Sequence, residues 1–196
     1  MTTTSRKLQS LNVARASAVA INGRRVMTAI GKRPVEGPRA VLPLGIEGDE
    51  QADLSVHGGP SKAVYSYPGE HYAFWQTVRA QAGLALWDEP LPPGSLGENL
   101  TLSGVAENEL WIGDLLRFPG CVLAVSEPRY PCFKFNAAMG FKHAGKLMAE
   151  SGWCGAYLAV REPGTIAAGE SFRLEPGPRE VGIGELFRAR MKRSPP

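Results

Sequence analysis

The sequence predicts a mainly β protein of the α+β class, in which short strands are joined by tight turns and accompanied by a few helices. Glycine (23) and proline (16) together make up about 20% of the 196 residues, against an average of about 12%, which indicates many turns and argues against a helix bundle. Hydrophobic residues (43%) and charged residues (21%) are close to globular averages, which excludes disorder and coiled coil. Short apolar segments separated by turn signals favour a β-barrel or α+β fold over a parallel βαβ sheet.

The first elements are expected to be strands. Residues 13–21 and 24–30 flank Asn22-Gly23, a dipeptide that supplies the positive φ angles of a two-residue hairpin turn. Two further strand candidates follow in the first half of the chain, residues 39–44 and residues 62–67.

A helix is expected within residues 69–83. Apolar side chains recur there at helical spacing, at positions 72, 75, 78 and 82, and Gly83 supplies a stop signal.

The second half is expected to continue with short strands and short helices. The strand candidates are residues 99–102, 115–118, 121–125, 156–160 and 171–174. The helix candidates are residues 133–139, 143–151 and a closing, cation-rich segment, 181–192. Because no Ser/Gly linker, charge block or low-complexity stretch divides the sequence, we expect residues 1–196 to form a single domain.

Charge and hydropathy exclude several classes of partner. The formal net charge of +3 and the pI near 8.8 are too mild for a nucleic-acid surface, but they suit a small anionic ligand if a few cations converge. The first ten residues lack the apolar core of a signal peptide, and no apolar run approaches the ~18 residues of a membrane span. We therefore expect a soluble, cytoplasmic protein with no nucleic-acid or membrane partner.

Cys132 is the first candidate for chemistry. The three cysteines, Cys121, Cys132 and Cys154, are odd in number and lack CxxC spacing, so neither a disulfide framework nor a zinc knuckle fits. Cys132 lies between the cations Arg129 and Lys134, and a following helix would further favour its thiolate as a nucleophile or soft-metal ligand. The alternative is a buried, inert cysteine, which is what the apolar surroundings of Cys121 and Cys154 predict.

The turn His57-Gly58-Gly59-Pro60 is a second candidate site. Its glycines are expected to expose backbone N–H groups, and bare amides beside the cation of Lys62 would form an anion-binding nest. The alternative is a tight turn followed by a solvated lysine.

Two further residues have open roles. Asn99 either offers its amide to a ligand or caps a turn, and Lys32, with its neighbour Arg33, either adds charge to an anion site or stays solvated. Familiar catalytic motifs such as GxGxxG after a strand, GxxxxGK[ST], HExxH and GxSxG are absent from the sequence. Three histidines are too few for a histidine-rich metal site.

Three motifs taken together resemble the MOSC family, which is named for the C-terminal domain of molybdenum cofactor sulfurase, and in particular its stand-alone, YiiM-like bacterial branch. The motifs are HGGPSKAV (57–64), GENL (97–100) and PRYPCFK (128–134), and their combination in this order is specific. The family often has Gln where Glu127 stands here. The resemblance implies a MOSC-type β-barrel with peripheral short helices, a core over approximately residues 26–175, and a C-terminal helical extension over approximately 179–193.

The resemblance also implies that the protein binds the molybdenum cofactor, molybdopterin, with Cys132 as the catalytic residue and the thiolate ligand of molybdenum. Cations and amides are expected to hold the rest of the cofactor. This expected cofactor-binding set is Lys32, His57, Gly58, Gly59, Lys62, Asn99, Arg129 and Lys134.

The activity that the resemblance implies is the reduction of small N-hydroxylated substrates, such as 6-hydroxylaminopurine or amidoximes, to the amine or amidine. Since the sequence carries no flavin, haem or iron–sulfur motif, electrons are expected from a separate electron-donating reductase protein. A non-catalytic carrier of the cofactor, or of sulfur as a Cys132 persulfide, is the alternative. A metal-free thiol enzyme is less favoured because no histidine lies near Cys132 in sequence. The natural substrate and the oligomeric state, including a homodimer, stay open.

Overall fold

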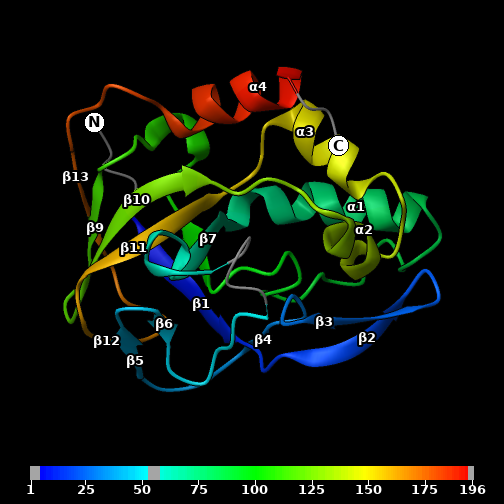
Figure 1. Cartoon of the computed structure of the whole chain (residues 1–196), viewed down its shortest axis with the longest axis horizontal. Coiled ribbons are helices and arrows are strands. Elements are labelled where there is room, and N and C mark those ends of the chain that lie inside the picture. The colour runs from blue at the N-terminus through cyan, green and yellow to red at the C-terminus, as the bar shows by residue number, and fades with distance from the viewer. Residues whose placement is uncertain (1–4, 53–57, 194–196) are drawn as a thin grey trace.

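The computed structural model describes residues 5–52 and 58–193, and within them the chain is organised around an eight-stranded mixed sheet (Figure 1). The strand order is β13-β9-β10-β11-β7-β8-β1-β4. In chain order these strands are β1 (Lys7–Val13), β4 (Arg33–Pro34), β7 (Val64–Pro68), β8 (Leu100–Ser103), β9 (Leu115–Arg117), β10 (Val122–Pro128), β11 (Ala156–Glu162) and β13 (Arg173–Glu175).

β7 and β8 run parallel at the centre of the sheet, whereas the other neighbouring strands of the described chain run antiparallel. Two consecutive parallel strands need a long crossover, usually one that contains a helix. The crossover here carries the short 3₁₀ turn η2 (Gly69–His71) and the helix α1 (Tyr72–Gln81), as the helical spacing predicted.

Two smaller sheets flank the main one. The hairpin of β2 (Ser17–Ile21) and β3 (Arg24–Thr28) turns at Asn22 (φ 51°) and Gly23 (φ 74°), which confirms the predicted hairpin. The second is a three-stranded sheet in the order β12-β5-β6, made of β12 (Gly164–Ile166), β5 (Arg39–Leu42) and β6 (Gly45–Ile46).

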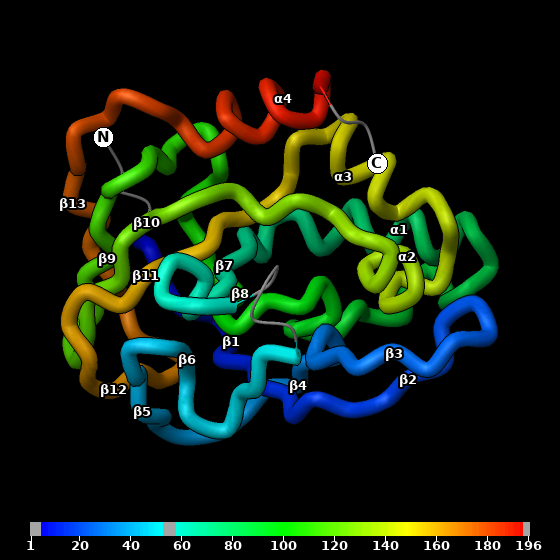
Figure 2. The backbone as a smooth tube through the Cα atoms, in the orientation of Figure 1, coloured from blue at the N-terminus to red at the C-terminus, as the bar shows by residue number. Residues whose placement is uncertain are grey.

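The remaining helical elements of the described chain are three α-helices and two 3₁₀ turns. They are α2 (Phe133–Met139), α3 (Ala144–Ser151) and α4 (Ile183–Arg193), with the 3₁₀ turns η1 (Pro60–Lys62) and η3 (Glu107–Glu109). Figure 2 shows α4 along the top of the molecule and α1, α2 and α3 gathered on the right. Trp75 of α1 meets Phe135 of α2 edge to face at 5.5 Å, and both rings are fully buried. This aromatic contact therefore fixes α2, and the residues just before it, against the core.

The predicted α+β class is confirmed, but the expected barrel is corrected. Within the described residues, the end strands β13 and β4 do not pair with each other, so the main sheet is not a closed barrel. On the edge of β1 that faces away from β8, only brief pairing is found among the described residues. The two-residue strand β4 pairs with one end of β1, and an isolated bridge joins Lys7 at the other end to Ser171. These contacts are too short to continue the ladder around the sheet.

β1 was not predicted, because its inward face carries polar side chains. Ser10 and Asn12 are buried, and Ser10 donates a hydrogen bond to Asn12 Oδ1 (2.7 Å). Asn12 in turn donates to Thr101 Oγ1 on β8 (3.1 Å). Such a polar inner face hides the alternation of apolar and polar residues that marks a strand in sequence. The very short strands β4, β6 and β12 were missed because they hold too few residues to show a period.

Several element boundaries moved by a few residues. The strand expected from residue 62 starts at Val64, since Pro60–Lys62 form a 3₁₀ turn. None of the helices that the structure describes combines the length and apolar character that crossing a membrane requires.

Asn99 joins three segments of the sheet at the start of β8. Its Oδ1 accepts the backbone N–H of Tyr65 (3.1 Å), and its Nδ2 donates to the carbonyl oxygen of Asn12 (3.2 Å). Its backbone also pairs with both residues, and the side chain is buried. Asn99 therefore stabilises the junction of β7, β8 and β1.

We predict that Asn99→Ala lowers the free energy of unfolding by about 2–4 kcal/mol, because it leaves a buried N–H and a buried carbonyl without a partner. Urea unfolding followed by circular dichroism measures the effect. The matched control is Asn108→Ala, at an exposed position of η3, which should change the free energy by less than about 0.5 kcal/mol. Equal midpoints for the two variants would contradict this structural role.

Candidate functional site

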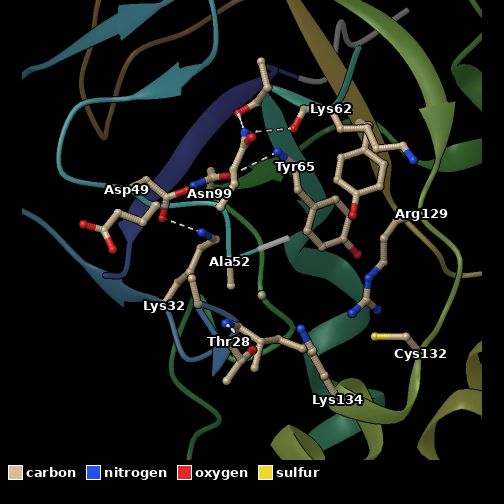
Figure 3. Close-up of a pocket in the computed structure, with 17 residues that line it drawn as sticks. Thr28, Lys32, Asp49, Ala52, Lys62, Tyr65, Asn99, Arg129, Cys132 and Lys134 are labelled. Carbon is tan, nitrogen blue, oxygen red and sulfur yellow. Dashed lines mark hydrogen bonds and ion pairs between the residues drawn. The ribbon is translucent and has the colours of Figure 1, made fainter. Parts of the chain in front are cut away.

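A pocket lies between the main sheet, the segment after β3 and the start of α2 (Figure 3). It brings together most of the residues that the sequence singled out. Those that line it are Lys32, Lys62, Asn99, Arg129, Cys132 and Lys134. Gly58 and Gly59 precede η1 outside the described lining, and His57 falls outside the described residues.

Arg129 follows β10 and is almost completely buried, with 4% of its surface exposed. Its guanidinium carbon lies 4.6 Å from the ring centre of Phe135 and 5.4 Å from that of Tyr65. Nη1 donates to the sulfur of Met148 (3.5 Å). Within the part of the chain that the structure describes, no carboxylate forms an ion pair with Arg129. A buried cation without an acidic partner is a strong candidate to bind an anion.

Cys132 lies beside this guanidinium, directly before the first residue of α2, as the sequence predicted. Figure 3 shows the Cys132 sulfur and the Arg129 guanidinium directed toward the same space. Cys132 is partly exposed, whereas Cys121 and Cys154 are buried. Burial raises the pKa of Cys121 to about 12 and that of Cys154 well above its ordinary value, so these two thiols resist ionisation. Cys132 is thus the thiol placed to react or to bind a metal.

Two further lysines reach the pocket from different elements. The Lys62 Nζ lies 3.6 Å from Glu127 Oε2 and 5.9 Å from the ring centre of Tyr157. The carboxylate of Glu127, the residue that departs from the family pattern, therefore partly offsets the positive charge of Lys62. Lys134 of α2 donates to the carbonyl oxygen of Met27 (2.9 Å), and no carboxylate of the described residues forms an ion pair with it.

Lys32 forms a buried ion pair with Asp49 in the wall of the pocket. The two side chains are 8% and 5% exposed. Burial lowers the pKa of Lys32, although the charges of Asp49 and Glu98 act in the opposite direction. Lys32 is therefore neither solvated nor an uncompensated cation.

The glycine turn differs from the expected nest. The N–H of Gly59 donates to Gln51 Oε1 (3.1 Å), so this amide is already occupied. Gly59 has a φ of 88°, a conformation that suits glycine, and Gln51 Nε2 also donates to the carbonyl of Leu44 (2.9 Å). Gln51 thus holds the turn and, through it, the backbone of Lys62.

Sequence reasoning missed several residues of the pocket wall. Asp49 and Gln51 belong to the polar run GDEQAD, whose composition alone does not say which side chain turns inward. Tyr65 and Tyr157 are paired across β7 and β11, with ring centres 5.4 Å apart. No local signal marks them, because only strand pairing places residues so distant in sequence side by side.

The donor set suits one kind of ligand. The described residues contain no group of three or more His, Cys, Asp or Glu side chains that could hold a bare metal ion. The pocket instead offers one soft thiol, Cys132, beside Arg129 and Lys134, which form no ion pair with a described carboxylate. This arrangement fits a soft metal carried on an anionic organic cofactor, to which the protein would supply a single thiolate ligand.

Comparison with known proteins places the chain in a known family. The model of the MOSC domain matches residues 53–173. YflK of Bacillus subtilis is 37% identical over 165 residues, covering 84% of this chain and 71% of that protein. YiiM of Escherichia coli is 35% identical over 159 residues, covering 81% of this chain and 68% of that protein.

A third relative, named as a reductase, comes from Gibberella moniliformis. It is 33% identical over 173 residues, and this chain spans only 30% of its length. The crystal structure of YiiM from Geobacillus stearothermophilus matches with a TM-score of 0.75 and 28% identity, covering 97% of this chain and 86% of that one. The matches support a MOSC-type protein associated with the molybdenum cofactor. The chain belongs to the MOSC domain family, within its YiiM-like branch.

Proposed function

We propose that this protein is an oxidoreductase that binds the molybdenum cofactor and reduces N-hydroxylated compounds, such as 6-hydroxylaminopurine or amidoximes, to the amine or amidine. The observation that carries the proposal is the pairing, in one pocket, of a partly exposed thiol, Cys132, with the buried guanidinium of Arg129. Family membership and the relative named as a reductase support the same class of activity.

In this proposal Arg129 holds an anionic group of the cofactor. A guanidinium presents a planar fork of N–H donors that matches an oxyanion, and burial strengthens such hydrogen bonds. Lys134 adds a second charge from α2, while Lys62 contributes less because Glu127 already faces it. Cys132 is the protein ligand to molybdenum, since a thiolate suits a soft, dithiolene-bound metal. When bound, the cofactor would supply the two electrons that cleave the N–O bond of an N–OH group.

The protein's own contribution is to orient the reactants and to limit access of water. The neighbouring tyrosines Tyr65 and Tyr157, whose rings are tilted by 45° to each other, form one wall of the pocket. The hydroxyl of Tyr65 donates to the carbonyl oxygen of Cys154 (2.8 Å), which holds its ring in place. Electrons come from a separate reductase protein.

We predict that Arg129→Met lowers affinity for the cofactor by about 1.5–3 kcal/mol, or roughly ten- to hundredfold, because one charge-assisted contact is lost. Pterin fluorescence and molybdenum analysis of protein from a cofactor-producing host measure occupancy. The cofactor-free variant should unfold at the same temperature as the wild type or higher, since the substitution removes a buried charge without an acidic partner.

The matched control is Arg161→Met, which removes an exposed arginine of β11 and should leave occupancy unchanged. Arg129→Lys should also be impaired, because lysine cannot make the bidentate contact. Full cofactor retention in Arg129→Met would remove Arg129 from the binding site.

We predict that Cys132→Ser retains cofactor but loses at least a hundredfold in the rate of reduction, which corresponds to about 2.7 kcal/mol of barrier. A hydroxyl is poorly ionised and cannot replace a soft thiolate, whereas Arg129 still holds the anionic group. The assay is anaerobic, with reduced dye as electron donor and 6-hydroxylaminopurine or a benzamidoxime as substrate.

The buried cysteines provide the controls for this experiment. Cys121→Ser and Cys154→Ser should affect stability alone, with unchanged rate per bound cofactor. If loaded wild-type protein reduces neither substrate, yet Cys132 accumulates a transferable persulfide, the protein is a sulfur carrier and the proposed activity is wrong.

A further inference from the structure

The Lys32–Asp49 ion pair gives the pocket a second functional region. Figure 3 shows this pair on the left of the pocket and Arg129 with Cys132 on the right, so the two regions face a common space. The two cations differ in charge balance. Arg129 has no acidic partner among the described residues, whereas Lys32 is already neutralised by Asp49. Lys32 is therefore poorly suited to hold an anionic cofactor.

The pair is buried but keeps unused hydrogen-bonding capacity. Asp49 Oδ1 accepts both the Lys32 ammonium and the backbone N–H of Ala14 (2.8 Å). An ammonium carries three N–H groups, and among the described residues Asp49 is the hydrogen-bond acceptor for Lys32. Lys32 thus lines the pocket with N–H groups that a bound molecule can engage.

Burying an ion pair in a pocket wall brings little net stability, because desolvation offsets the attraction of the two charges. A role in catalysis explains the buried Lys32–Asp49 pair better than a contribution to stability does. Reduction of R–NH–OH to R–NH₂ and water takes up two electrons and two protons. The N–O bond breaks, and the departing oxygen and the nitrogen each gain a proton.

We propose that Lys32 is the proton donor in this reduction and that Asp49 positions it and restores its proton. The inference rests on the proposed function. Lys32 gives its proton to the departing hydroxyl oxygen, which leaves as water, and the nitrogen takes up the second proton from solvent. The two electrons come through the cofactor from a reduced electron-carrier protein. The neutral amine of Lys32 then regains a proton from solvent by way of Asp49.

The surroundings of Lys32 suit a proton donor. Burial lowers its pKa, which makes the ammonium a better acid than an exposed lysine near neutral pH. Acidic groups on the packed segments oppose this shift in part. Among the described residues, the charged and titratable groups that face Lys32 or share its pocket are Asp49, Glu50, Glu98, Lys62, Tyr65, Arg129, Cys132, Lys134 and Tyr157.

The decisive variants are Lys32→Met and Lys32→Arg in cofactor-loaded protein. Arginine keeps the positive charge but cannot give up its proton in a protein. A proton donor predicts that both variants lose roughly a hundredfold in kcat/KM, with cofactor content equal to that of the wild type by pterin fluorescence. Lys142→Met, at an exposed position before α3, is the control and should keep the wild-type rate.

The pH dependence supplies a second test, which holds even if a Lys32 variant folds poorly. Because the reaction needs protonated Lys32, the wild-type rate falls as pH rises through the pKa of Lys32. Asp49→Asn removes a charge that raises this pKa, so the fall should move to lower pH. Side-chain nitrogen NMR of cofactor-free protein should show the amine of Lys32 titrating below the other lysines, and lower still in Asp49→Asn.

Three outcomes would overturn the inference. If Lys32→Arg restores the wild-type rate, Lys32 supplies charge alone. If Lys32→Met loses cofactor but keeps its rate per bound cofactor, Lys32 is a binding residue. An unchanged pH profile in Asp49→Asn excludes the coupling of the pair. A different result tests the proposed function. If cofactor-loaded wild-type protein reduces no N-hydroxylated substrate, the proposed function is wrong, whereas the three outcomes above concern Lys32 and Asp49 alone.

Discussion

The interactions of the buried Arg129 guanidinium with its neighbours hold the elements of the pocket together. It packs against Tyr65 of β7 and Phe135 of α2 and donates to Met148 of α3, so it joins the central sheet to two helices. Each aromatic face contributes roughly 0.5–2 kcal/mol toward a desolvated cation. Arginine keeps its charge under all ordinary conditions, and these contacts compensate it only in part. The geometry is therefore one that an anionic ligand completes, with Cys132 beside that ligand.

The cations of the pocket differ in charge compensation, and this difference suits them to different roles. Arg129 and Lys134 lack acidic partners within the described residues and can bind an anion. Lys32 is neutralised by Asp49, and Lys62 faces Glu127. Binding and proton transfer need opposite properties, since a binding cation must keep its charge while a proton donor must give it up. The fold places both kinds of cation around one space.

Much of the fold was accessible from local sequence. The hairpin, the helices and most strands were predicted, because turn residues and helical spacing act over a few positions. Where polar residues face inward, as Ser10 and Asn12 do on β1, the pattern fails. The closed barrel was expected from the family resemblance and is not found in the described residues, since closure depends on pairing between strands at opposite ends of the sheet.

For the site, the sequence by itself determined the chemical groups and their local setting. It placed Cys132 ahead of a helix, between Arg129 and Lys134. The tertiary structure alone decided which cation has an acidic partner. Lys32 meets Asp49 across 17 positions, and the Gly59 amide is occupied by Gln51. Charge compensation depends on distances between side chains of separate elements, and only their packing sets those distances.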